Sequence, residues 1–336
     1  MRKLQYLSPT SIGMFYANRA EFYLNYLCEN RPGRLPQTQP MSIGSSFDAH
    51  VKSHLHESLF GKSNDPKYEL QALFEAQVEP QNRDWAWPNG THAFEVYKAS
   101  GAIQDLMLDL QSSLIQPRFE IDVKGAVAGY REGVTRSMPT ELGDSIPLLG
   151  KPDVFYINKN GAHVVLDWKV NGYCSKWGNS PIKGYVRLRE NGKNKGHHKE
   201  AMLMTHNGVM INYAHFLETV EETWARQLAI YAWLLGEDIG GDFIAAIDQL
   251  SCKPNQFGDP HPDIRIAEHR ARISSDYQWK AFAQAQEVWE VVNSNHIFRD
   301  MTFEESELKC KSLDGMKGDG SDNDQFFLEA TRPGQR

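Results

Sequence analysis

The stretch LLGKPDVFYINKNGAHVVLDWKV, residues 148–170, is the part of the sequence that most strongly indicates the fold. Asn160-Gly161 is a dipeptide that supplies the positive φ values of a tight turn, and it separates two runs rich in apolar residues. The stretch therefore predicts a β-hairpin. Three charged residues, Asp153, Asp167 and Lys169, stand on strands that otherwise favour burial.

Side chains two residues apart on a strand point to the same face. Asp167 and Lys169 are therefore expected on one face, with Trp168 on the other, and Asp153 is within reach from the partner strand. Two carboxylates and an ammonium group suit a divalent cation and its bound water. The alternative is a cross-strand or diagonal salt bridge, which is the commoner fate of an Asp-x-Lys tripeptide.

The residues before the hairpin predict a largely helical part over residues 1–115. Ser8 is expected to cap a helix that starts at Pro9, and a second helix is expected to be entered through Gly44. Two further helices are predicted over 66–79 and 91–115. Strand-like alternation begins at QPRFEIDVKGAVAGY, residues 116–130.

The residues after the hairpin continue an α/β pattern. Residues 170–212 are expected to be irregular, and a helix, two strands and a second helix are then predicted over 221–238, 241–250, 263–273 and 274–294. With no internal repeat and no clear linker, the sequence favours a single domain over 1–312. Its α/β core would span 116–300, and a polar tail would follow over 313–336.

Composition and charge exclude several classes of protein. The chain has 336 residues, is 40% hydrophobic and carries a formal net charge of -7, so any nucleic-acid contact requires a local basic patch. Its four cysteines lie far apart and predict neither a disulfide framework nor a zinc site. No stretch approaches the roughly 18 apolar residues of a membrane span. A cytoplasmic protein without membrane contact is expected.

Four motifs, in this order along the chain, resemble the PD-(D/E)xK nuclease superfamily. The resemblance is closest to the RecB-like and Cas4-like exonuclease branch, which includes many phage enzymes. The matching segments are SPTSIGMFYANRAEFYLNYL, IGSSFDAHV, Pro152-Asp153 with Asp167-Trp168-Lys169, and Gln227 with Tyr231. The resemblance implies a restriction-endonuclease-like core, which is a central mixed β-sheet flanked by helices, with an N-terminal helical elaboration.

The resemblance also implies roles for individual residues. Asp153 and Asp167 would bind Mg²⁺ or Mn²⁺ with the main-chain carbonyl of Trp168, and Lys169 would orient the attacking water. Gln227 and Tyr231 share a helical face, and they would contact a phosphate or support the lysine. Without the family, Gln227 reads as a core amide with a buried partner.

The second motif departs from the family, whose usual form is Gly-[Ser/Thr]-x-x-His with a metal-binding histidine. Counted from Gly44, the ligand position here holds Asp48, and His50 follows two residues later. We take Asp48 as the ligand and keep His50 in reserve. The two differ by about 200° around a helix, so one ion would not bind both.

Other positions complete the implied site. Glu120 would supply a further catalytic carboxylate, although a solvated strand acid is an equal alternative. Some members of the branch hold an iron-sulfur cluster, but the early cysteine position falls near Asn18 and no late cysteine cluster follows. No cluster is therefore expected, and no nucleotide either, because a Gly-x-x-x-x-Gly-Lys-[Ser/Thr] motif is absent.

The segment 170–199 is basic and interleaved with aromatic residues, which is typical of a surface that guides a nucleic-acid strand. Arg187, Arg189, Lys193 and Lys195 are the predicted DNA contacts. An ordinary solvated loop is the alternative.

The sequence thus favours a Mg²⁺- or Mn²⁺-dependent DNA nuclease, most simply an exonuclease of phage or bacterial recombination, replication or repair. DNA is the expected partner, together with a single-strand annealing protein, a helicase or another recombination protein. The alternatives are a site-specific endonuclease and a non-catalytic nucleic-acid-binding or assembly protein that retains the fold.

Overall fold

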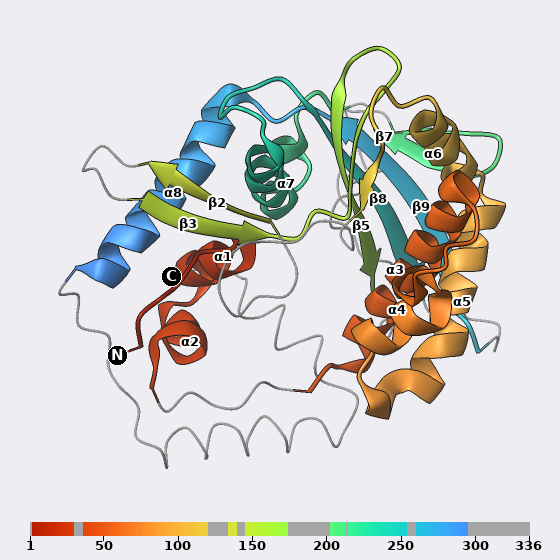
Figure 1. Ribbon diagram of the computed structural model, residues 1–336, viewed down its shortest axis with the longest axis horizontal. Helices are drawn as coiled ribbons and strands as arrows, with labels where there is room; N and C mark the ends of the chain where they lie inside the picture. The colour runs from red at the N-terminus through yellow and green to blue at the C-terminus, as the bar shows by residue number, and fades with distance from the viewer. Residues whose placement is uncertain are drawn as a thin grey trace, which may run out of the picture.

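The computed structural model describes residues 2–29, 36–119, 134–139, 145–173, 202–212, 214–253 and 260–294. Across these residues the protein has an α/β fold, in which a mixed sheet is flanked by helices on both faces (Figure 1). The predicted α/β class with a mixed sheet is confirmed. The predicted polar tail over 313–336 lies outside the described residues.

The described part of the main sheet has seven strands, in the order β1-β4-β5-β8-β9-β7-β6. β5 runs parallel to β8 and β7 runs parallel to β9, while the other neighbouring strands are antiparallel. The bounds are β1 Arg118–Phe119, β4 Val154–Ile157, β5 His163–Asn171, β6 Met202–Met204, β7 Met210–Asn212, β8 Ile244–Lys253 and β9 Asp263–Ala271. A separate two-stranded sheet pairs β2 Val134–Pro139 with β3 Ser145–Gly150.

The hairpin β4–β5 has the strands that the sequence predicts, with Val154 opposite Leu166. Its turn differs from the prediction, because no described residue other than glycine has a positive φ. Gly161 alone supplies it, at φ 82°. The Asn158 side chain accepts hydrogen bonds from the amides of Asn160 and Ala162, each at 3.0 Å, and this holds the longer turn.

Helices make up most of the first third of the chain, as predicted. Ser8 caps the first helix in a capping box with Ser11, whereas the second helix begins earlier than expected, capped by Thr38, so Gly44 lies within it. The bounds are α1 Pro9–Ala17, α2 Arg19–Phe22, α3 Gln39–Phe60, α4 Leu70–Gln77, α5 Arg83–Ala99, α6 Ala102–Gln111, α7 Glu222–Leu235 and α8 Ser275–Asn293.

The two faces of the sheet bury separate apolar clusters. Val165, Ala245 and Ile247 pack against side chains of α1, α7 and α8. Leu166, Trp168 and Leu250 face the opposite way, toward side chains of α3, α5 and α6. In Figure 1, α7 and α8 accordingly lie on one side of β5, β8 and β9, and α3 to α6 lie on the other.

Two features of the fold were not expected from the sequence. The short strands β6 and β7 lie in a segment that was predicted to be irregular, and the predicted helix over 91–115 is divided at Gly101, whose φ is 89°. Among the described helices, none combines the length and the apolar character that crossing a membrane requires.

Candidate active site

Strand β5 delivers two charged side chains to the face of the sheet that α7 covers. Asp167 and Lys169 alternate with Leu166 and Trp168, which belong to the cluster on the other face. Because Val154 pairs with Leu166, the residue opposite Asp167 is Asp153, which directly precedes β4. The hairpin thus brings Asp153, Asp167 and Lys169 together on one face.

Gln227 of α7 connects the acid and the lysine. Lys169 Nζ forms an ion pair with Asp167 Oδ2 and donates a hydrogen bond to Gln227 Oε1 at 3.0 Å. The amide of Gln227 donates to Asp167 Oδ1 at 3.3 Å and to the Tyr231 hydroxyl at 3.0 Å. Gln227 therefore fixes the Asp167 carboxylate and the Lys169 ammonium group relative to each other. A purely structural core amide would not need two charged partners.

The ring of Tyr231 packs against the backbone of Gly150 in β3. A Cβ atom added to Gly150 would lie 2.6 Å from Cε1 of Tyr231 and 2.6 Å from Cδ1 of Leu234. Only a residue without a side chain lets β3 approach α7 this closely. Burial raises the pKa of Tyr231, and the Asp167 carboxylate raises it further, so the hydroxyl stays protonated.

Asp167 is the most deeply buried acid of this group, with a side chain that is 5% exposed. Burial raises the pKa of Asp167 to about 7; Lys169 opposes this shift, and the Asp153 carboxylate adds to it. The Asp153 carboxylate is oriented by the main-chain amide of Trp168, which donates to Oδ2 at 3.1 Å. Two carboxylates are therefore crowded in a place with little water.

This donor set fits a hard divalent cation. Mg²⁺ takes oxygen ligands and is usually held by one or two carboxylates, with water and substrate phosphate completing its shell. Asp153 and Asp167 provide two carboxylates, and a cation between them would offset the charge that burial disfavours. Within the described residues, no group of three or more His, Cys, Asp or Glu side chains is gathered to hold a metal.

Lys52 is the residue of this site that the sequence analysis missed. Its side chain is 0% exposed, and Nζ lies 2.7 Å from Asp48 Oδ2 and 3.2 Å from Asp153 Oδ1. The available signal was a lysine one helical turn after Asp48, between Val51 and Leu55 of the same helix. The ammonium group of Lys52 thus connects Asp48 to Asp153. The role of Asp48 as a metal ligand stays a prediction.

His50 lies elsewhere on α3. Its Nδ1 is 2.8 Å from the carbonyl oxygen of Ser46, and its Nε2 is 3.0 Å from Oγ1 of Thr91. Its ring lies against those of Trp87 and Phe94, and burial lowers its pKa. The structure does not bring His50 to the carboxylates.

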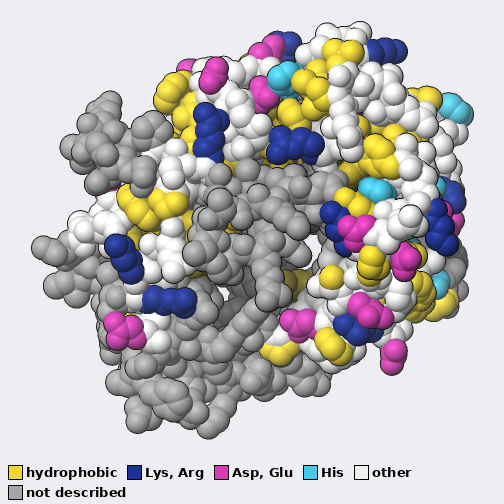
Figure 2. All heavy atoms as spheres, viewed as in Figure 1, with side chains coloured by type: hydrophobic (Ala, Val, Ile, Leu, Met, Phe, Trp, Pro, Cys, Tyr) yellow, Lys and Arg dark blue, Asp and Glu magenta, His cyan; other side chains and the backbone are white. Residues whose placement is uncertain are grey.

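Five of the predicted site residues belong to segments outside the described part of the chain. Glu120 lies outside the described residues, and so do the predicted DNA contacts Arg187, Arg189, Lys193 and Lys195. On the face drawn in Figure 2, the described Lys and Arg side chains are interspersed with Asp and Glu. This view therefore offers no basic path for DNA among the described residues of that face.

Trp168 is anchored on the opposite face of the sheet. Its Nε1 donates to the Tyr97 hydroxyl at 3.4 Å, and that hydroxyl donates to Asp248 Oδ2 at 2.5 Å. Arg270 Nη1 lies 2.6 Å from Asp248 Oδ1. This buried chain fixes the residue between Asp167 and Lys169, and nothing in the sequence pattern predicted it.

Glu268 lies beside this chain and gives a testable pH dependence. Burial raises its pKa from 4.5 to about 7; Arg270 lowers it, and Asp248, Asp105 and Asp109 raise it. The folded protein therefore binds this proton more tightly than the unfolded chain. Glu268 stabilises the fold fully below its unfolded pKa, and this contribution is lost as the pH rises through its folded pKa, by up to about 1.4 kcal/mol per pH unit.

Glu268→Gln is accordingly expected to flatten part of the fall in unfolding free energy between about pH 4.5 and pH 8. Urea unfolding of the wild type and the variant at several pH values measures the difference. If the two curves run parallel over this range, Glu268 does not titrate as its surroundings indicate.

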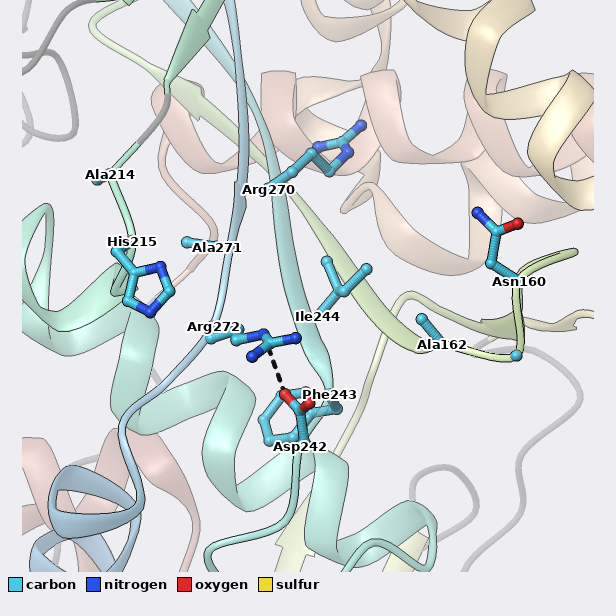
Figure 3. A pocket seen from close by; sticks show the side chains of 11 residues that line it. Asn160, Ala162, Ala214, His215, Asp242, Phe243, Ile244, Arg270, Ala271 and Arg272 are labelled. Atoms are coloured by element: carbon cyan, nitrogen blue, oxygen red, sulfur yellow. Dashed lines mark ion pairs between the residues drawn. The ribbon is translucent and has the colours of Figure 1, made fainter.

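A separate cavity of about 500 Å³ opens where β8 begins and β9 ends. Figure 3 shows Arg272 directed at Asp242, and the Nε–Oδ1 distance of this ion pair is 3.1 Å. Arg270 and His215 also line the cavity, whereas Asp153, Asp167 and Lys169 do not. The cavity is therefore distinct from the candidate active site at Asp153 and Asp167.

Comparisons with known proteins add little to this geometry. No family model matches the chain, and no curated protein matches it. A solved protein described as "Crystal structure of SSO0001" is 11% identical, with 82% of this chain and 86% of that chain covered and a TM-score of 0.25. A similarity this low carries no argument about the fold or the function.

Proposed function

We propose that the protein is a Mg²⁺- or Mn²⁺-dependent DNA nuclease of the PD-(D/E)xK type, acting as an exonuclease. The observation that supports this most is the convergence of Asp153, Asp167 and Lys169 on one sheet face, with Gln227 contacting both members of the Asp-Lys pair. Asp153 pairs with Lys52 and Asp167 pairs with Lys169, but two structural salt bridges give no reason for the two carboxylates to lie opposite each other across the hairpin.

The arrangement of the strands is compatible with this proposal. A restriction-endonuclease-like core would use the hairpin β4–β5 to carry the acids and the lysine, and α7 to cross to the parallel strand β8. The helix that makes this crossover also carries Gln227 and Tyr231 to the site.

The chemistry follows from these positions. Asp153, Asp167 and the carbonyl of Trp168 would hold the cation, and the cation would supply Lewis-acid chemistry by lowering the pKa of water and balancing charge on the phosphate. Lys169 orients that water and stabilises the negative charge of the transition state. Gln227 keeps the ammonium group in place. The water would attack phosphorus in line and break the bond to the 3′-oxygen. The proton that the water loses would pass to solvent, and the leaving 3′-oxygen would take up a proton from solvent.

The biological setting belongs to the proposal as well. The chain would act in the cytoplasm on DNA, in phage or bacterial recombination, replication or repair, beside an annealing protein or a helicase. Since the net charge is -7, DNA affinity requires a concentrated basic patch. The predicted contacts in segment 170–199 remain our candidates for it.

The test is an assay on end-labelled linear DNA and covalently closed circular DNA, with and without Mg²⁺. We expect release of nucleotides from linear ends only when Mg²⁺ is present. Cutting of the circle would favour the endonuclease alternative. DNA binding without cleavage under every metal condition would favour the non-catalytic alternative.

A further inference from the structure

Lys52 is a lysine whose side chain is 0% exposed. A buried ammonium group is costly unless opposite charges and hydrogen bonds compensate the loss of water. Here Nζ lies 2.7 Å from Asp48 Oδ2 and 3.2 Å from Asp153 Oδ1. The ammonium group of Lys52 therefore bridges the carboxylates of Asp48 and Asp153, which are far apart in the sequence.

The bridge is built on a rigid element. Asp48 and Lys52 are one turn apart on α3, so their side chains share a helical face. Phe47, Val51 and Leu55 of the same helix are fully buried in the cluster against the sheet. The helix thus holds the ammonium group at one end of the Asp153 carboxylate, while the Trp168 amide contacts the other oxygen.

Charge counting distinguishes this arrangement from a site for two metals. In a two-metal site, the ions lie about 3.5–4 Å apart, on either side of the reacting phosphate. Here Asp153 faces Lys52 through Oδ1, and its neighbour across the hairpin is Asp167. The position between Asp48 and Asp153 is filled by the ammonium group of Lys52, whose side chain is 0% exposed. Asp167 is paired with Lys169, but that side chain is 22% exposed and can give way to a metal between Asp153 and Asp167.

We infer that Lys52 is a built-in cation that takes the place of a second metal between Asp48 and Asp153, so that the site binds one divalent cation. Asp48 is then a positioning residue for Lys52 and not a metal ligand, which replaces the role predicted from the sequence. This inference rests on the proposed function, because it concerns the same metal site.

The experiment is an equilibrium titration of the full chain with Mn²⁺, in which bound ions per chain are counted by calorimetry and by the electron paramagnetic resonance of free Mn²⁺. The wild type is expected to bind one ion. Lys52→Met keeps the length of the side chain but removes the charge, so it is expected to bind two. Adding Asp48→Asn to Lys52→Met should return the count to one.

Two further variants keep the result interpretable. Asp48→Asn alone should bind one ion with unchanged affinity. If Lys52→Met does not fold, this variant still shows whether Asp48 is a metal ligand. Lys280→Met is the matched control, because Lys280 pairs with one carboxylate, Glu222, in an exposed ion pair. It should keep the wild-type count.

The outcomes separate this inference from the proposed function. Two ions on the wild type, or loss of the ion in Asp48→Asn, would overturn the role of Lys52 and leave a metal-dependent nuclease standing. A count of one in Lys52→Met would overturn it too. A wild type that binds no Mn²⁺ would contradict the proposed function itself.

Discussion

Lys169→Ala is expected to slow DNA cleavage by about 10² to 10⁴, the usual contribution of a positioned acid–base group. The fold should remain intact, because Lys169 is 22% exposed and its contacts are made at the tip of the side chain. Without the ammonium group, Asp167 keeps the amide of Gln227 as a partner. In the absence of metal, Asp167 can also take up a proton.

Single-turnover cleavage at saturating Mg²⁺ measures this effect, with DNA binding and thermal unfolding followed in parallel. Lys280→Ala is the control, since it removes a lysine from an ion pair at the surface. Full cleavage by Lys169→Ala would remove Lys169 from the chemistry and reduce the Asp-x-Lys pair to a salt bridge.

Asp167→Asn is expected to abolish high-affinity Mn²⁺ binding and DNA cleavage together, while the metal-free protein loses no stability. The amide is nearly isosteric with the carboxylate, but it lacks the negative charge that a divalent cation requires. Asp167 is 4% exposed, and an ionised carboxylate in such a place costs folding free energy. Replacing it removes that cost.

Glu268→Gln is the matched control for this variant. Burial raises the pKa of Glu268 to about 7, as it does for Asp167, but Glu268 lies opposite Asp248 on the other face of the sheet. It should therefore keep Mn²⁺ binding. An Asp167→Asn protein that binds Mn²⁺ as the wild type does would place the metal elsewhere.

Local sequence signals predicted the elements on which the site is built. The alternation of apolar residues predicted β4 and β5, and helical periodicity with Gln227 and Tyr231 on one face predicted α7. Ser8 and Pro9 predicted the start of α1. In each case, the physical cause lies within a few residues of the element, so a single sequence contains it.

Contacts between distant segments could not be predicted in this way. The approach of Lys52 to Asp153 depends on how α3 packs on the sheet, and the Tyr97–Asp248 hydrogen bond joins residues 151 positions apart. The strands β6 and β7 have three residues each, which is too short for a period of two to be recognised. β7 pairs with the distant strand β9, and β6 pairs with β7.

The metal site is the central claim, and an anomalous difference map from a crystal soaked in Mn²⁺ tests it most directly. We expect one strong peak, about 2.1 Å from a carboxylate oxygen of Asp153 and of Asp167, while Lys52 remains between Asp48 and Asp153. A map without a peak at these two carboxylates, at a Mn²⁺ concentration that supports cleavage, would contradict the account.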